Sequence, residues 1–60
     1  MDLKNLRRER GLSQAALAKK AQVAQSSISY LEAGMKNPSV KMVKKLAKAL
    51  EVDLTTLIES

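Results

Sequence analysis

The sequence predicts an all-α fold, a compact bundle of five short helices. Apolar residues recur at spacings of three and four along most of the chain, which is the period of an amphipathic helix. Glycines and capping residues divide this pattern into short stretches, and no stretch shows the alternation of β-branched residues typical of a strand. A chain of 60 residues has one small core, because a domain of this length buries roughly 60% of the surface that its unfolded chain exposes. We therefore expect residues 1–60 to form a single domain.

The first helix is expected over about residues 2–10. Asp2 is suited to cap its N-terminus, because a carboxylate there accepts hydrogen bonds from free N–H groups and interacts favourably with the helix dipole. Gly11 can adopt the left-handed conformation that ends a helix. Leu12 can then pack back against the helix that precedes it.

The second and third helices are expected over about residues 14–21 and 25–33, with Ser13 as the cap of the second. Only three residues join them, so the two helices cannot lie antiparallel and must cross at a steep angle, as in a helix-turn-helix. Such a crossing needs a small residue where the backbones approach, and Ala18 lies on the inner face of the second helix. The apolar residues expected between the two helices are Leu17, Ala21, Val23, Ile28 and Leu31.

The fourth helix is expected over about residues 40–50, after Ser39 as its cap, and a short fifth helix follows Asp53. The apolar positions of the fourth helix are Val40, Val43, Leu46, Ala47 and Leu50. Its outer face carries Lys41, Lys44, Lys45 and Lys48. A lysine face of this kind is typical of a solvated surface, but Lys41 or Lys44 could also lie near phosphates.

The composition excludes several classes of function. The chain has no His and no Cys, which excludes imidazole metal sites, zinc fingers of the Cys types, disulfides and His- or Cys-dependent catalysis. It is also too short to enclose a substrate pocket of several hundred Å³, so we expect no enzyme, cofactor, metal or small-molecule ligand. No apolar run is long enough to cross a membrane. The net charge of +5 calls for a negatively charged partner, which could be nucleic acid, an anionic membrane or an acidic protein.

Two stretches of the chain resemble the helix-turn-helix domain of phage repressors and Cro proteins, the Xre-like type. They are LSQAALA at residues 12–18 and ISYLEAG at residues 28–34. Arg7 ahead of GLSQ, the segment NPS at residues 37–39, and the last two helices match the same pattern, so the resemblance covers nearly the whole chain. It implies a lambda-repressor-like bundle with the helix-turn-helix at helices two and three.

The resemblance also implies a function. It indicates sequence-specific binding of double-stranded DNA by a small transcriptional regulator, acting as a repressor through occupancy of its operator. The third helix would enter the major groove, and two chains would bind as a homodimer to the half-sites of a palindromic operator, about one helical turn apart. A regulator of this type, from a prokaryote or a phage, is expected in the cytoplasm and associated with the nucleoid.

Polar residues on the outer face of the third helix are the candidates for contact with base edges. A glutamine can pair with an adenine edge through two hydrogen bonds, and a serine can meet any base or a phosphate. The resemblance places base contacts at Gln25, Ser26 and Tyr30. Gln25 could instead be a solvated first-turn residue, and Tyr30 could shield the edge of the core. The expected phosphate contacts are Ser13, Gln14, Ser27, Ser29, Lys36, Asn37 and Lys41.

Arg7 and Glu32 are expected to form a structural bridge between the first and third helices. A glutamate in the last turn of a helix is unfavourable against the helix dipole unless a cation holds it, and in the family an arginine of the first helix does so. Two residues depart from the family pattern. Gln22 stands where glycine is usual, and Ala24 stands where a Ser or Thr usually caps the third helix.

Several alternatives remain open at this point. Leu54, Leu57 and Ile58 on the last helix are candidates for a dimer contact, or they could close the core. The chain has no room for a separate dimerisation domain, unless it is the DNA-binding part of a longer regulator. An antitoxin that also binds its own promoter, or a controller protein of a restriction–modification system, would share this domain. A membrane-active peptide is disfavoured, because the bulky aromatic anchors of such peptides are missing.

Overall fold

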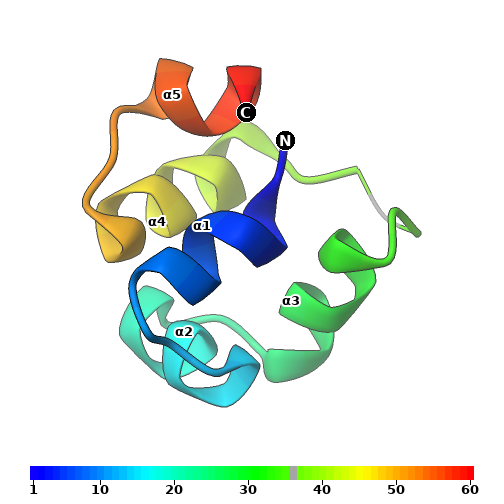
Figure 1. Cartoon of the computed structure of the whole chain (residues 1–60). Coiled ribbons are helices and arrows are strands. Elements are labelled where there is room, and N and C mark those ends of the chain that lie inside the picture. Colours follow the sequence, from blue (N-terminus) through cyan, green and yellow to red (C-terminus); the bar gives the residue numbers. More distant parts are fainter. Residues whose placement is uncertain (36) are drawn as a thin grey trace.

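Five α-helices follow one another along the chain, as the sequence predicts (Figure 1). The structure is a computed structural model that describes residues 1–35 and 37–60, and no strand occurs among these residues. The helices are α1 (Leu3–Glu9), α2 (Gln14–Ala21), α3 (Gln25–Glu32), α4 (Val40–Leu50) and α5 (Leu54–Glu59). The first and third helices are one residue shorter at their ends than expected, because Asp2, Arg10 and Ala33 are caps.

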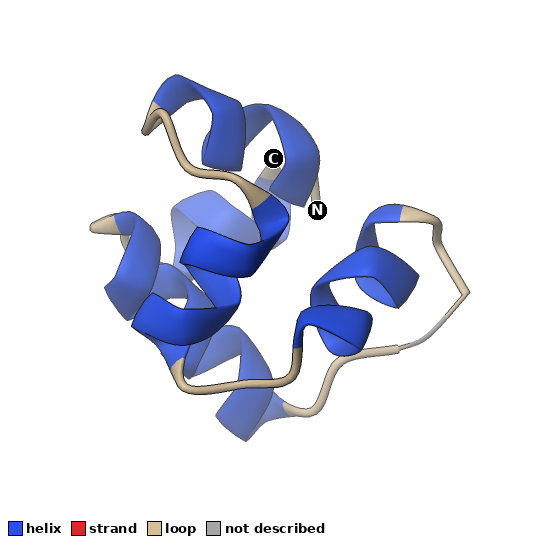
Figure 2. Cartoon of the chain, turned by 90° about the horizontal axis from the view of Figure 1, so that it is seen from below, coloured by secondary structure: helices blue, strands red, loops and turns tan. Residues whose placement is uncertain are grey.

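The helix α2 lies at the centre of the packing, where it contacts both α3 and α4. The helix α5 packs on α4, and α1 packs on α3. Figure 2 shows the same arrangement from below, with the longest connection, residues 33–39, leading from α3 to α4. The two chain ends lie side by side, since the backbone N–H of Asp2 donates to Ser60 Oγ at 2.8 Å. The helix α3, which the sequence analysis expects to enter the major groove, therefore packs against both α1 and α2.

Each of the five helices contributes to a single core. Its fully buried large side chains contribute about 1.5–3 kcal/mol each when they leave water, which is the main stabilisation of so small a domain. The buried apolar residues are Leu3, Leu17, Ala18, Ala21, Ile28, Leu31, Val43, Leu46, Ala47, Ala49, Leu50 and Leu57. The apolar residues predicted between α2 and α3 are confirmed as part of this core, and Val23 packs against it as a partly buried member.

Three of the predicted N-caps are confirmed by hydrogen bonds. The Asp2 carboxylate accepts from the N–H of Asn5 at 3.3 Å, and the hydroxyls of Ser13 and Ser39 each accept from the N–H three residues later. Asp53 was expected to cap α5, and it lies at the N-cap position with an extended backbone, but its side chain accepts no hydrogen bond from the helix. Ala24 likewise offers α3 no side-chain cap.

Four helices end on a residue in the left-handed conformation. Two of these residues are glycines, Gly11 with φ 68° and Gly34 with φ 73°. The other two are Gln22 and Glu51, both with φ 58°, a conformation that costs a side-chain-bearing residue roughly 1 kcal/mol. Gln22 thus adopts the left-handed conformation although it stands where glycine is usual in the family. Glu51 was not anticipated. In each case the next residue donates its N–H to a carbonyl five positions back, as Val23 does to Ala18 at 2.9 Å.

Three positions differ from the sequence analysis. Val40 is 68% exposed, because it lies at the first position of α4, beyond the edge of the core. Ala49 is buried although it lies off the expected apolar face, since α4 is covered on two sides by α2 and α5. Leu57 has no exposed surface, so this candidate for a dimer contact instead closes the core, which was the alternative for it.

Candidate nucleic-acid interface

The outward face of α3 carries the residues expected to meet base edges. Gln25, Ser26 and Tyr30 are exposed, with 48% of Tyr30 accessible, while Ile28 and Leu31 on the opposite face are buried. The helical period therefore separates a packed side of α3 from a polar side. Among the expected phosphate contacts on this helix, Ser29 is exposed and Ser27 is half-buried.

The predicted bridge between α1 and α3 is present. Arg7 Nε donates to Glu32 Oε2 at 2.6 Å and Arg7 Nη2 donates to Glu32 Oε1 at 3.1 Å, so the guanidinium grips the carboxylate with two parallel bonds. The two side chains are only 10% and 5% exposed. A third bond, from Arg7 Nη1 to the carbonyl of Leu12 at 2.7 Å, ties the pair to the end of α1. The bridge thus fixes α3 relative to α1 and to the start of α2.

The hydrogen bonds from Arg7 hold the pKa of the Glu32 carboxyl below its ordinary value, although burial opposes this. A bond from Gln14 and the nearby charge of Lys4 act in the same direction. The pKa of Arg7 is raised by the same partner. Both groups therefore remain charged at neutral pH, and their charges cancel within the fold.

The N-terminus of α2 lies next to this bridge. Ser13 is exposed, and its hydroxyl accepts from the N–H of Ala16 at 3.0 Å, so its own hydrogen remains available to a ligand. Gln14 was expected to contact phosphate, and the structure gives its amide a further partner: Nε2 donates to Glu32 Oε1 at 3.1 Å. This bond was not foreseen, because nothing local in the sequence shows that α2 begins beside the end of α3.

The connection from α3 to α4 carries the remaining expected contacts. Asn37 and Lys41 are both exposed. Lys36 lies outside the described residues, so its expected phosphate contact has no structural description. Met35 and Val40, at 74% and 68% exposed, are apolar side chains on the surface of the same region.

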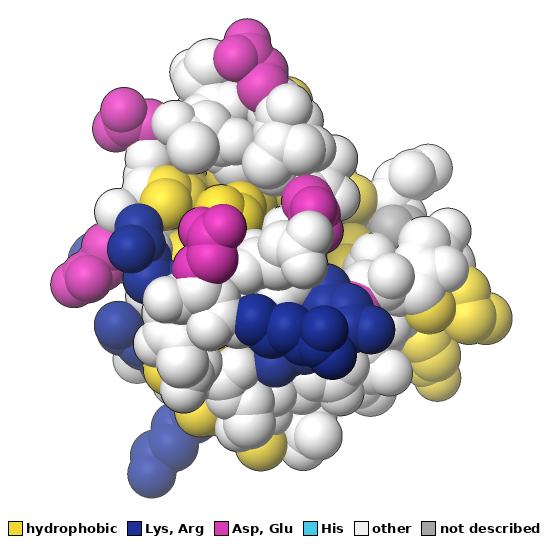
Figure 3. Space-filling view, in the orientation of Figure 1, with side chains coloured by type: hydrophobic (Ala, Val, Ile, Leu, Met, Phe, Trp, Pro, Cys, Tyr) yellow, Lys and Arg dark blue, Asp and Glu magenta, His cyan; other side chains and the backbone are white. Residues whose placement is uncertain are grey.

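An open pocket of about 430 Å³ lies where α1, α3 and the start of α2 meet. Figure 3 shows a compact group of Lys and Arg side chains over the region where α1 and α3 adjoin. The pocket is lined by Lys4, Arg7, Arg8, Gln14, Ser29, Glu32 and Ala33. Lys4 and Arg8 were missed by the sequence analysis, although their spacing of four places both on one face of α1.

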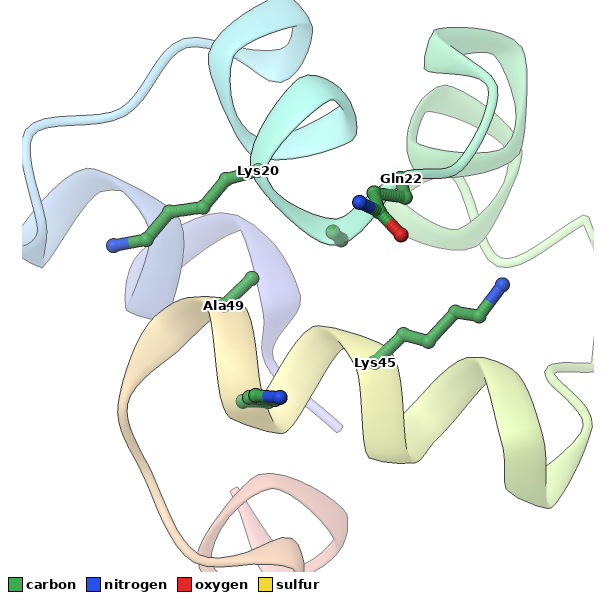
Figure 4. Close-up of a pocket in the computed structure, with 6 residues that line it drawn as sticks. Lys20, Gln22, Lys45 and Ala49 are labelled. Atoms are coloured by element: carbon green, nitrogen blue, oxygen red, sulfur yellow. The ribbon is translucent and has the colours of Figure 1, made fainter.

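A second basic groove, of about 330 Å³, lies between the end of α2 and α4 (Figure 4). Its cationic lining residues are Lys20, Lys45 and Lys48, and Gln22 also lines it. The side chains of Lys20 and Lys45 point away from one another in Figure 4. No residue of α3 lines this groove.

Three further features bear on function. Among residues 1–35 and 37–60, no three carboxylate, His or Cys side chains gather as they would around a metal ion. Of the helices in the same described ranges, none has the length and apolar character to span a bilayer. On α5, Ile58 is 55% exposed and Leu54 is partly buried against the core.

Comparison with known proteins supplies the family. The Helix-turn-helix family model matches residues 3–57. The chain is 38% identical over 58 residues to the HTH-type transcriptional regulator SinR of Bacillus subtilis, a match that covers 95% of this chain and 52% of SinR. The chain therefore spans about half the length of the curated relatives it matches first.

Two solved structures have the same fold. One is SinR, the master regulator for biofilm formation, in complex with DNA, with a TM-score of 0.89, 38% identity, and coverage of 93% of this chain and 90% of that one. The other is the restriction-modification controller protein C.AhdI from Aeromonas hydrophila, with a TM-score of 0.91, 36% identity, and coverage of 93% and 85%. The chain belongs to the helix-turn-helix family, in its Cro/C1-type branch.

Proposed function

We propose that this chain binds double-stranded DNA in a sequence-specific manner, as the DNA-binding unit of a transcriptional regulator. The observation that carries the proposal is the exposed polar face of α3, fixed by the buried Arg7–Glu32 bridge and flanked by cations. Family membership and the likeness to a SinR structure that contains DNA support it. All five helices share one core, so we infer that residues 1–60 act as one unit.

The proposed interface has two kinds of contact, one with base edges and one with phosphates. An α-helix of about 10–12 Å diameter fits a major groove about 12 Å wide, so Gln25, Ser26 and Tyr30 would meet base edges there. Phosphate contacts position the helix without reading sequence. We assign them to Ser13, Gln14, Ser27, Ser29, Asn37 and Lys41, and keep Lys36 as a prediction from the sequence.

We further infer that two chains bind the half-sites of a palindromic operator and repress by occupying it. The dimer contact cannot rest on Leu57, which is fully buried, so Ile58 is the exposed apolar residue that α5 offers. A regulator that binds DNA acts in the compartment that holds the DNA, so we expect this chain in the cytoplasm of a prokaryotic cell. We expect it to have no catalytic activity of its own.

Selection of duplexes from a random pool tests this function. The expected result is enrichment of one consensus motif with two symmetric halves, bound more tightly than a scrambled duplex or a single strand. Failure to enrich any motif, or equal binding of duplex and single strand, would overturn the proposal. Enrichment of a single, unsymmetrical motif would support sequence-specific DNA binding and overturn the proposed dimer.

A controller protein of a restriction–modification system is the second candidate. It is favoured by the likeness to C.AhdI, and it keeps the same DNA-binding surface. The genes beside the one that encodes this chain distinguish the two candidates. A neighbouring methyltransferase and endonuclease would favour the controller, and their absence would favour a regulator of other genes.

A further inference from the structure

We propose that the pocket between α1 and α3 holds a phosphate group of the DNA backbone, and that Lys4 and Arg8 supply its positive charge. The inference rests on the proposed DNA binding and adds to it two cations of α1. Neither belongs to the contacts expected on α2, α3 or the connection to α4.

The charge of Arg7 is not available to a ligand. Its Nε and Nη2 donate to Glu32, and its Nη1 donates to the carbonyl of Leu12. The carboxylate of Glu32 is equally occupied, because Oε2 accepts from Arg7 and Oε1 accepts from both Arg7 and Gln14. The buried pair therefore adds no net charge to the pocket. The remaining charged residues that line it are Lys4 and Arg8, both exposed and neither in an ion pair with a described residue.

Two neutral donors complete the lining. The Gln14 amide has two N–H groups, and its bond to Glu32 uses one of them and fixes the orientation of the other. Ser29 is exposed and can donate its hydroxyl hydrogen. Two cations and two neutral donors around a carboxylate that already accepts three hydrogen bonds suit a ligand with acceptors only, and a phosphodiester oxygen is such a ligand.

The pocket also has the right position on α3. Ser29 belongs both to the pocket and to the exposed face of α3, one turn after Gln25. When a helix fills the major groove, the sugar–phosphate backbone that borders the groove lies along the flank of the helix. A duplex read by Gln25 and Ser26 therefore brings one strand against the side of α3 where the pocket opens.

The basic groove between α2 and α4 lacks these features and provides a matched control. It has three lysines, but no residue of α3 lines it, and Lys20 and Lys45 point apart (Figure 4). Removing two charges there changes the net charge of the chain by the same amount as removing Lys4 and Arg8. The comparison separates a local phosphate contact from a general effect of charge.

The test measures how the affinity for a selected duplex depends on salt. Four chains are compared: the unsubstituted chain, K4Q/R8Q, the charge-conserving K4R/R8K, and the control K20Q/K48Q. Each contacted phosphate contributes about −0.9 to the slope of log K against log salt concentration, so K4Q/R8Q, which removes the contact to one phosphate, is expected to reduce the magnitude of the slope by about 0.9 per bound chain. K4R/R8K should keep the slope, and the control should change it far less. Thermal unfolding followed by circular dichroism verifies that each variant is folded.

Equal slopes for K4Q/R8Q and K20Q/K48Q, whether changed or not, would overturn the inference while leaving the proposed function standing. Absence of duplex binding by the unsubstituted chain would overturn the proposed function and the inference with it. A further arm replaces chloride by inorganic phosphate at constant ionic strength. Any weakening of duplex binding by inorganic phosphate should be smaller in K4Q/R8Q. Inorganic phosphate that binds the chain through Lys4 and Arg8 without weakening duplex binding would assign the pocket to a free phosphate and overturn its role on DNA.

Discussion

Replacing Glu32 by alanine removes the acceptor of three hydrogen bonds, two from Arg7 and one from Gln14. Arg7 would then remain in a site where its side chain is only 10% exposed, with the carbonyl of Leu12 as its one partner among the described residues. Breaking a buried ion pair by removing one member costs about 3–5 kcal/mol, because the other charge is left without compensation.

This cost is large compared with the stability of the domain. At about 0.05–0.15 kcal/mol per residue, a chain of this length has a free energy of unfolding of roughly 3–9 kcal/mol. We therefore expect Glu32→Ala to be partly or wholly unfolded at 25 °C. Urea unfolding followed by circular dichroism measures the loss, since the chain has no Trp and a single Tyr.

Two further variants test whether the loss of stability comes from the uncompensated charge of Arg7. Glu32→Gln keeps the shape of the side chain and loses only its charge, so it should be destabilised less and remain measurable. The double variant R7M/E32L removes both charges together, and its free energy of unfolding should lie within about 2 kcal/mol of the value for the unsubstituted chain. A cost below about 1 kcal/mol for Glu32→Ala would show that Arg7 finds water or another acceptor, and that the bridge does not hold α3.

Gln25→Ala should reduce discrimination against the wrong base by about 1–3 kcal/mol at one position of the selected site, whereas Lys41→Gln should weaken all duplexes alike; loss of discrimination in both variants would contradict this division of roles. Gln22→Gly should raise the free energy of unfolding by about 0.5–1 kcal/mol in urea, because the left-handed penalty exceeds the entropy that glycine adds to the unfolded chain, and a destabilised variant would refute this. The pKa of Glu32 is lower in the folded chain than its ordinary value of 4.5, so the charged carboxylate stabilises the fold above that pH. The free energy of unfolding, measured as a function of pH, should therefore fall as the pH drops below about 4.5, and Glu32→Gln should flatten this fall.

Local signals in the sequence were sufficient to predict the helices. Ser13 and Ser39 cap their helices as expected because a cap depends on residues only three positions apart. Gly11 ends α1 because a left-handed residue costs glycine nothing. Glu51 ends α4 in the same conformation without any such signal, although this conformation costs a residue with a side chain roughly 1 kcal/mol.

The site was predicted in part. The Arg7–Glu32 bridge followed from the family pattern, and the polar face of α3 followed from the helical period. The bond from Gln14 to Glu32 and the place of Lys4 beside α3 could not be predicted, because each depends on how helices distant in the chain approach one another. Periodicity fixes which face of a helix is polar, but it does not say which neighbour that face meets.

The most direct test of the account is a map of the surface that contacts DNA. An isotope-labelled chain is titrated with its selected duplex, and the chemical-shift changes of its backbone amides are recorded by NMR. The largest changes are expected in α3 at Gln25, Ser26 and Ser29 and at the start of α2, with little change around Lys20 and Lys48. Changes concentrated in the groove between α2 and α4, with α3 unaffected, would contradict it.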